Sequence, residues 1–230
     1  MIRELLYPRR CFLCDQLVDV MEEIPLCRQC RPEYYLPRGG RCPVCSRPVE
    51  GEGKCAGCRQ HGNETPGQST FLYEGAVRDS IRRFKYEGRR DYAPGYARTM
   101  ACFDQDWFRR LDQCFLVPVP VHRRRRIARG YNQAQLLAQE LARILCVPVW
   151  DGLTRCRDTA PLQPMTARAR REILSGAFEV RQRSRGLPEG CAVLVDDIYT
   201  SGSTVEECAS TLQNAFGGLK VRFWTLSVRA

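Results

Sequence analysis

Two aspartates and a short run of hydroxylated residues stand close together near the C-terminal end of the chain. Asp196 and Asp197 follow an apolar stretch at 192–195, and residues 200–204 read Thr-Ser-Gly-Ser-Thr. Ionised carboxylates only accept hydrogen bonds, which suits a ligand with hydroxyl groups, such as a sugar phosphate, or the Mg²⁺ ion that accompanies it. The spacing therefore predicts a binding site for a ligand that carries both hydroxyl and anionic groups.

The elements on either side of these residues would hold them at one edge of a sheet. The stretch 192–195 is typical of a strand buried on both faces of a parallel sheet, and the aspartates follow where that strand should end. Helical spacing comes next, at Val205, Cys208, Ala209, Leu212 and Phe216. A helix N-terminus directs free N–H groups and the positive end of its dipole at one point. We therefore expect a phosphate to be held by Thr200, Ser201, Gly202, Ser203 and Thr204.

An ordinary strand, turn and helix, with solvated aspartates and a Ser/Thr cap, would explain the same pattern without a ligand. The stretch has neither the Gly-Lys-Ser/Thr ending of a nucleotide-binding P-loop nor the GxGxxG of a dinucleotide site. Those two classes of phosphate site are therefore excluded.

A second unit of the same kind lies earlier in the chain. Residues 115–121 indicate a strand, an arginine-rich loop follows at 123–129, and a helix is expected to begin near Asn132. In open α/β sheets, ligands bind where such loops meet at the carboxyl ends of the strands. Arg123 and Arg129 are therefore candidates for holding the most highly charged part of the ligand. A solvated or nucleic-acid-binding arginine run is the alternative.

Eight of the fourteen cysteines form four CxxC pairs in the first 58 residues. Each CxxC lets two thiolates reach one tetrahedral ion, and two such turns close the site. The segments between them are too rich in Arg, Pro and Gly to build a core, so metal would supply the folding energy. We expect two structural Zn²⁺ sites in which pairing in chain order is the simplest arrangement and cross-braced pairing stays open. The expected ligands are Cys11, Cys14, Cys27, Cys30, Cys42, Cys45, Cys55 and Cys58. The other six cysteines show no ligand spacing and are expected to be buried, reduced thiols.

Length and charge agree with a two-part chain. The 230 residues suffice for one ordinary domain and a smaller module, which we place at 70–230 and 1–62, with a polar linker at 59–69. The net charge of +10 comes mostly from arginines after residue 66 and favours polyanionic ligands. No apolar stretch approaches the ~20 residues of a membrane span, and the N-terminus does not read as a signal peptide, so we expect a cytoplasmic protein.

The remaining elements follow from hydrophobic spacing. Strands are expected at 70–73, 147–150, 152–154, 177–180 and 219–228. Helices are expected around 77–84 and over 89–111, and the basic face of the first, which includes Lys85, is slightly more in keeping with solvation than with binding. Residues 155–176 have no core pattern in their first half, and they predict a mobile loop that closes on a charged ligand.

Taken together, these motifs resemble a known family. The Asp-Asp and Thr-Ser-Gly-Ser-Thr stretch is similar to the phosphoribosyl-pyrophosphate (PRPP) motif of type I phosphoribosyltransferases. With PVHRRRRIARGYNQAQLLA at 120–138, the later Arg, Thr and Gln, and the cysteine module, the chain resembles the ComF/GntX family. That family joins a zinc-finger module to a phosphoribosyltransferase-like domain and is associated with DNA uptake in competent bacteria. The implied fold is α/β: a doubly wound parallel sheet with a small hood.

The resemblance also implies roles for individual residues. Asp196 and Asp197 would hold the ribose hydroxyls and stabilise positive charge at C1, and 200–204 would hold the 5′-phosphate. Arg123 and Arg129 would face the pyrophosphate of PRPP, which is expected to bind together with Mg²⁺. The flexible loop would contribute Arg155, Thr159, Gln163 and Arg171. One departure is Thr200, which stands where purine-salvage relatives carry a carboxylate, so a general base for the acceptor is missing.

Two functions therefore stay open. The first is phosphoribosyl transfer from PRPP to an unknown acceptor. The second is a non-catalytic protein of DNA uptake that binds single-stranded DNA, with the PRPP site as a sensor or vestige and other DNA-uptake proteins as partners. Aromatic residues that stand among the arginines suit base stacking or a core equally well: Tyr34, Tyr35, Phe84, Tyr86 and Tyr131. A purely structural zinc scaffold would leave the acidic motif unexplained.

Overall fold

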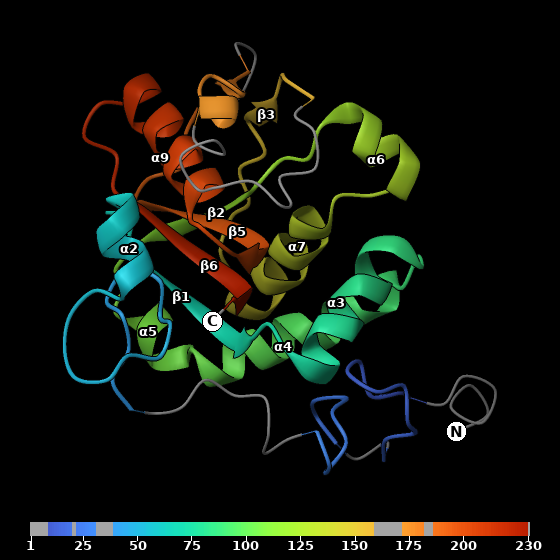
Figure 1. Ribbon diagram of the computed structural model, residues 1–230. Coiled ribbons are helices and arrows are strands. Elements are labelled where there is room, and N and C mark those ends of the chain that lie inside the picture. Colours follow the sequence, from blue (N-terminus) through green and yellow to red (C-terminus); the bar gives the residue numbers. More distant parts are fainter. Residues whose placement is uncertain (1–8, 20–21, 31–38, 159–171, 182–185, 230) are drawn as a thin grey trace.

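The centre of the molecule is a sheet of four parallel strands. The computed structural model describes residues 9–19, 22–30, 39–158, 172–181 and 186–229 (Figure 1). The strands are β1 (Gly67–Leu72), β2 (Cys114–Pro118), β5 (Cys191–Tyr199) and β6 (Val221–Val228), and they lie in the order β1-β6-β5-β2. The central strands β5 and β6 are buried along most of their length, as expected for parallel strands covered on both faces.

Helices cover both faces of this sheet (Figure 1). Leu116, Val193 and Trp224 face α3 (Gly75–Tyr86), α4 (Ala93–Phe103) and α7 (Gln133–Leu145). Phe115 and Leu194, one residue away along each strand, face α9 (Ser203–Ala215) instead. The antiparallel pair β3 (Leu153–Arg155) and β4 (Phe178–Val180) lies on the α9 side. The doubly wound α/β architecture expected from the sequence is therefore present.

The two cysteine groups pack on opposite faces of the sheet. The first, with Cys11 and Cys30, packs into the core under α3, α4 and α7. The second, with Cys42 and Cys58, packs into the core under α9, and its last cysteine lies on the short helix α2 (Ala56–His61). The module is therefore split between two cores.

Three expected elements differ in extent. The helix expected over 89–111 is a 3₁₀ turn (Arg90–Tyr92) followed by α4 and α5 (Gln105–Arg109). The break lies at Asp104, whose buried carboxylate accepts hydrogen bonds from Thr70 and Trp224 and so turns toward the sheet. The strand expected at 147–150 is a single bridge between Leu116 and Val149, and the strand expected at 70–73 begins earlier, at Gly67.

The linker expected at 59–69 is built into the fold. Its first residues end α2, where Gly62 adopts a left-handed conformation, and its last residues form the start of β1. A Cβ at Gly67 would overlap Phe223, so a small residue is needed where β1 passes β6. Asn63 and Thr65 are buried. Polar composition alone did not reveal that this segment is held by specific hydrogen bonds.

The arginine-rich loop is a helix, α6 (Arg123–Arg129). The His122 side chain accepts a hydrogen bond from the Arg124 N–H at its start, and Gly130 ends it with φ 78°. Arginine is a good helix former, so the run can close two turns between these caps.

The six remaining cysteines are free, as expected, but only Cys114 and Cys208 are buried. Cys102, Cys146 and Cys156 are exposed, which corrects the expectation that all six lie in the core. Cys146 caps the end of α7 in a left-handed conformation, where the chain turns at the surface. Of the helices within the described ranges, none has both the length and the apolar character needed to cross a bilayer.

Candidate anion site and metal centres

The acidic pair lies inside β5 and does not follow it, because pairing with β6 continues to Tyr199. Neighbouring residues of a strand point to opposite faces. Asp197 faces α3, where Lys85 Nζ lies 2.8 Å from Asp197 Oδ1 and the two side chains are only 17% and 9% exposed. Asp196 Oδ1 accepts a hydrogen bond from the Asp197 N–H at 2.8 Å. The two carboxylates therefore have different surroundings, although they are adjacent in sequence.

These surroundings make the ionised form of Asp196 less favourable. Burial raises the pKa of the Asp196 carboxyl from 3.8 to about 7, and the charge of Asp197 adds to the rise, while Lys85 and Arg155 oppose it. Hydroxyl donors or a divalent cation brought by a ligand would favour the charged form of Asp196. The pair is suited to a ligand that supplies such groups.

The expected phosphate loop connects β5 to α9. Gly202 has φ 81° and is the N-cap of α9, so no side chain of the cap residue shields the first turn. A Cβ at this position would overlap the Tyr199 hydroxyl and the Asn63 amide. Ser201 Oγ and Ser203 Oγ lie 2.9 Å apart, and Thr200, Ser201 and Thr204 are partly exposed. The loop thus combines a helix N-terminus with hydroxyl groups, as an anion site requires.

The structure separates the two arginines that were expected to act together. Arg129 lines a hollow of about 360 Å³ together with Lys85, Tyr86 and Arg125, next to the ion pair with Asp197. Arg123 lines a different cavity, of about 670 Å³, on the other side of α6. Neither lining, as far as the described residues go, includes the acidic pair or the loop at 200–204, but the smaller hollow contains Lys85, the ion-pair partner of Asp197. Arg129 is therefore the better placed of the two for a ligand at Asp197.

Arg155, the first residue of the expected mobile loop, is the last residue of β3. Its guanidinium lies 5.4 Å from the centre of the Phe178 ring, and burial lowers its pKa. Part of that loop is therefore fixed on the small β-sheet. Thr159, Gln163 and Arg171 lie outside the described residues.

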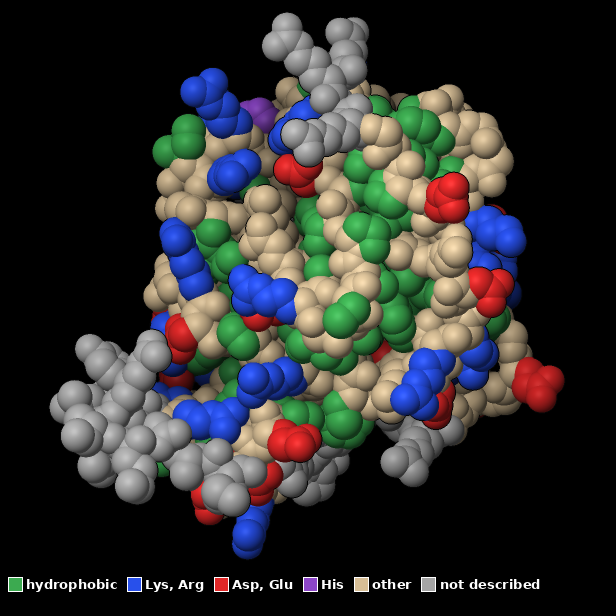
Figure 2. All heavy atoms as spheres, turned by 180° about the vertical axis from the view of Figure 1, so that it is seen from behind, with side chains coloured by type: hydrophobic (Ala, Val, Ile, Leu, Met, Phe, Trp, Pro, Cys, Tyr) green, Lys and Arg blue, Asp and Glu red, His purple; other side chains and the backbone are tan. Residues whose placement is uncertain are grey.

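The surface of α6 is strongly basic. Arg123, Arg124 and Arg126 are exposed, and Ile127 beside them is 71% exposed. Seen from behind, Lys and Arg side chains follow the edge of the molecule near α6 (Figure 2). Of the aromatic residues expected near arginines, Phe84 and Tyr131 are core residues, whereas Tyr86 is exposed and lies 5.0 Å from the Arg129 guanidinium. Tyr34 and Tyr35 lie outside the described residues.

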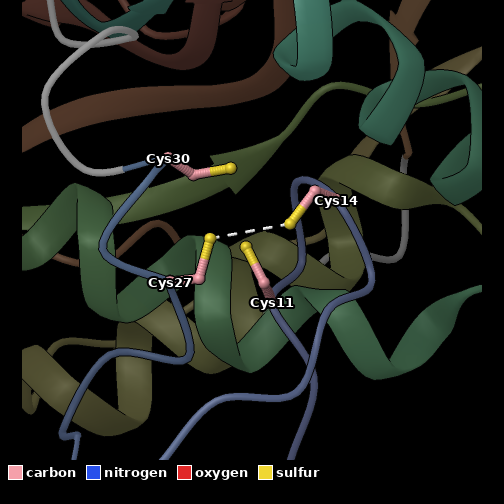
Figure 3. A group of neighbouring side chains, drawn as sticks. All are labelled: Cys11, Cys14, Cys27 and Cys30. Atoms are coloured by element: carbon pink, nitrogen blue, oxygen red, sulfur yellow. Dashed lines mark hydrogen bonds between the residues drawn. The ribbon is translucent and has the colours of Figure 1, made fainter.

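The eight CxxC cysteines form two groups of four in chain order. In each group the four sulfur atoms lie within 4.8 Å of one another. In the first group they face a shared space, and Cys14 Sγ lies 3.6 Å from Cys27 Sγ (Figure 3). Cys45 Sγ and Cys55 Sγ are also 3.6 Å apart in the second. Tetrahedral zinc with Zn–S bonds of about 2.3 Å needs sulfur atoms about 3.8 Å apart, so both groups fit the ion.

The second group has a thiol that is already acidic. Hydrogen bonding from Cys45 lowers the pKa of Cys58 to about 5. The same hydrogen bond, together with burial, raises the pKa of Cys45. Four such sulfurs in one buried space need a cation before all can ionise. Cys45 and Cys58 therefore lie in surroundings typical of a closed structural metal site, in which buried thiolates bind one cation.

Three residues that contact the site were not identified from the sequence. Lys85 was counted with a solvated basic face, although it is one of only three lysines in an arginine-rich chain. Arg47 and Asn63 contact the loop, with Arg47 Nη2 donating to the Thr200 carbonyl at 3.1 Å and Asn63 Nδ2 donating to the Ser201 carbonyl at 2.8 Å. Neither stands in a recognisable motif, so only the fold reveals them.

Fold and site together define a class: a cysteine-rich module joined to an open parallel α/β sheet, with an acidic pair and a hydroxyl-rich loop at its carboxyl edge. Residues 2–59 match the double zinc ribbon domain. DNA utilization protein YhgH of Escherichia coli (strain K12) is 31% identical over 87% of this chain and 96% of that protein. Competence protein F of Haemophilus influenzae is 28% identical over the same shares. Competence protein ComFC of Bacillus subtilis is 25% identical over 94% of this chain and 93% of that protein. The chain belongs to the ComF family, in which a zinc module is joined to a phosphoribosyltransferase-like domain.

Solved structures give a weaker likeness. A structure of adenine phosphoribosyltransferase from Saccharomyces cerevisiae is 14% identical, covers 66% of this chain and 75% of its own, and has a TM-score of 0.39. This level of overlap adds nothing to what the sheet order already shows.

Proposed function

We propose that the protein binds PRPP with Mg²⁺ at the carboxyl edge of its sheet and acts in DNA uptake. The observation that carries the proposal is the placement of Asp196, Asp197 and the 200–204 loop at the end of one central strand. Carboxylates would hold the ribose hydroxyls, and the loop would hold the 5′-phosphate. The link to DNA rests on relatives named competence protein and DNA utilization protein.

The pyrophosphate would lie toward Lys85 and Arg129. Both line the hollow beside Asp197, and a guanidinium and an ammonium suit the most highly charged part of PRPP. Mg²⁺ would enter with the ligand and would offset part of the charge of its pyrophosphate, because this ion favours hard oxygen ligands.

Binding is better supported than transfer. Transfer would form a bond from an acceptor atom to C1 of the ribose while the bond from C1 to the pyrophosphate oxygen breaks, with the electron pair leaving on the pyrophosphate. The acceptor must also lose a proton. Position 200 holds Thr, whose hydroxyl is not a base at neutral pH, so position 200 does not provide the proton acceptor.

A thermal-shift titration tests the proposal. PRPP with Mg²⁺ should raise the melting temperature more than ribose 5-phosphate does, because only PRPP also reaches Lys85 and Arg129. A pyrophosphate-release assay with candidate acceptors separates the two functions. Turnover with any of them would make the protein a transferase, and ligand binding without release would make it a PRPP-binding protein.

A second function, single-stranded DNA binding, is favoured by α6. Three exposed arginines, an exposed Ile127 and the nearby Tyr86 offer phosphate contacts and apolar or aromatic surface on one side of the molecule. The two functions are compatible, because α6 presents Arg125 and Arg129 to the hollow beside Asp197 and other arginines to solvent.

A further inference from the structure

Two short chains of hydrogen bonds connect the second cysteine group to the proposed phosphate loop at 200–204. The group consists of Cys42, Cys45, Cys55 and Cys58. In the first, Arg47 Nη1 lies 3.6 Å from Cys55 Sγ while Nη2 of the same guanidinium donates to the Thr200 carbonyl at 3.1 Å. One planar side chain thus spans a metal-ligand sulfur and the loop. A third contact, from Arg47 Nε to the Arg229 carbonyl at 2.8 Å, fixes its orientation.

The second chain runs through Tyr199. The Tyr199 hydroxyl accepts a hydrogen bond from Asn63 Nδ2 at 2.9 Å, and its oxygen lies 3.9 Å from Cys58 Sγ, so its own proton can be directed at that sulfur. Asn63 Nδ2 also donates to the Ser201 carbonyl at 2.8 Å. Cys58, Tyr199 and Asn63 are all buried, so these contacts are shielded from water.

Holding two successive carbonyls in this way sets the direction of the loop N–H groups. In a trans peptide the C=O and the following N–H point in opposite directions. With the carbonyls of Thr200 and Ser201 bound on the side of the metal module, the N–H groups of Ser201 and Gly202 are turned to the other side. Those are the groups that an anion at the start of α9 would use.

The first turn of α9 is held from the same module. Glu206 Oε1 accepts hydrogen bonds from the N–H groups of Glu64 and Thr65, each at 3.0 Å, and its Oε2 accepts from Thr65 Oγ1 at 2.8 Å. The segment that leaves Cys58 therefore fixes both the loop and the helix behind it.

We propose that the second metal centre positions the phosphate loop, so that metal binding at Cys42, Cys45, Cys55 and Cys58 and PRPP binding at 200–204 strengthen each other. This inference rests on the proposed function. Asn63 and Arg47 are positioning residues, which act on the ligand through the loop backbone. The first centre lies on the opposite face of the sheet and, in the described part of the chain, has no such connection to the loop.

Thermodynamic reciprocity gives the test. If metal at the second centre strengthens PRPP binding by some factor, PRPP must strengthen metal retention there by the same factor. The protein is purified with its zinc, and the equilibrium distribution of zinc between the protein and a colorimetric chelator is measured with and without PRPP and Mg²⁺. We expect PRPP to strengthen the retention of one of the two zinc equivalents, by about tenfold, and to leave the other unchanged.

Variants identify the connection. Asn63→Ala and Arg47→Lys keep all eight cysteines, so both should still contain two zinc equivalents, yet each should lose most of the protection by PRPP and bind PRPP and ribose 5-phosphate more weakly by a similar factor. Arg10→Ala is the matched control, because Arg10 adjoins the first centre and donates to the Asp15 carbonyl within it. It should retain the full protection.

The outcomes separate the two proposals. Absence of PRPP binding to the wild type would overturn the proposed function and this inference with it. Normal PRPP binding that protects neither zinc, or both equally, would overturn the inference and leave the proposed function intact. Full protection in both Asn63→Ala and Arg47→Lys would also overturn it.

Discussion

Lys85 Nζ lies 2.8 Å from Asp197 Oδ1, and both side chains are largely removed from water. Lys85 lies in the last turn of α3 and Asp197 lies near the end of β5, so this ion pair joins the first helix of the sheet domain to its central strand. Its neighbour Asp196 has no comparable cation at this distance among the described ion pairs and carries a raised pKa. The two adjacent carboxylates should therefore respond in opposite ways to neutralisation.

Asp197→Asn should destabilise the protein, because it leaves the Lys85 ammonium without its partner in a largely buried place. Breaking a fully buried pair costs about 3–5 kcal/mol, and with the small exposure of this one we expect about 2–4 kcal/mol. Urea unfolding monitored by circular dichroism measures the change. Lys85→Met should be destabilising as well, and an unchanged stability in both variants would show that the pair is not held in solution.

Asp196→Asn should stabilise the ligand-free protein at pH 8. The folded-state pKa is about 7 and the unfolded value about 3.8, so the charged carboxylate lowers stability progressively above pH 4 and in full above pH 7. The variant should melt higher than the wild type at pH 8, by ~2–4 °C for each kcal/mol gained, and the difference should shrink at pH 5. A difference that is larger at pH 5 than at pH 8 would contradict the raised pKa.

The affinity for PRPP should fall as the pH drops below about 7. Below that value Asp196 takes up a proton, and a protonated carboxyl holds ribose hydroxyls or Mg²⁺ less well than a carboxylate. Binding measured between pH 5.5 and 8.5 should weaken toward the acid end in the wild type. Asp196→Asn binds more weakly throughout and should lose this dependence, which separates Asp196 from the second ionisation of the 5′-phosphate itself.

Protein purified without added zinc should contain about two zinc equivalents, because each four-cysteine group fits one ion. Metal analysis decides the number, and one equivalent or none would contradict two closed centres. Removal of both ions should loosen both cores, since each group packs under a different face of the sheet. Near-ultraviolet circular dichroism should record this loss of packing in the aromatic region.

Single-stranded DNA should bind with a strong dependence on salt, and replacement of the four residues 123–126 by Ser should reduce the slope of log affinity against log salt. Removing one arginine that neutralises a phosphate reduces the slope by about 0.7 for single strands. Arg109→Ser with Arg110→Ser is the matched control, because both are exposed at the end of α5, away from α6. A slope that changes by the same amount per arginine removed in both variants would mean that α6 has no special role.

The sequence was most informative where a pattern has one structural solution. The apolar stretch at 192–195 and the helical spacing from Val205 to Leu212 led to β5 and α9, and the CxxC spacing led to two cysteine groups in chain order. These features depend on short-range periodicity and on ligand geometry, which are visible in the residues themselves.

Interactions between distant segments were not accessible in the same way. Lys85 meets Asp197 only because the fold brings the last turn of α3 to the end of β5, and Asn63 reaches Tyr199 only because β6 pairs with both β1 and β5. The polar composition of 59–69 predicts a loop, and no local signal distinguishes a solvated asparagine from one that bridges two parts of the fold. The run at 123–129 was expected as a loop because its charge suggested solvent exposure, whereas its caps and helix propensity permit two turns.

Calorimetric titration of the wild type with PRPP and Mg²⁺ tests the central claim most directly. We expect measurable heat with one site per chain, weaker binding of ribose 5-phosphate, and about tenfold weaker PRPP binding in Asp197→Asn, since each charge-assisted hydrogen bond contributes roughly 1.5–3 kcal/mol. Thr204→Val should weaken both ligands by the same factor, because both carry the 5′-phosphate. Folded, zinc-loaded wild type that gives no heat with PRPP at millimolar concentration would contradict the assignment of this site.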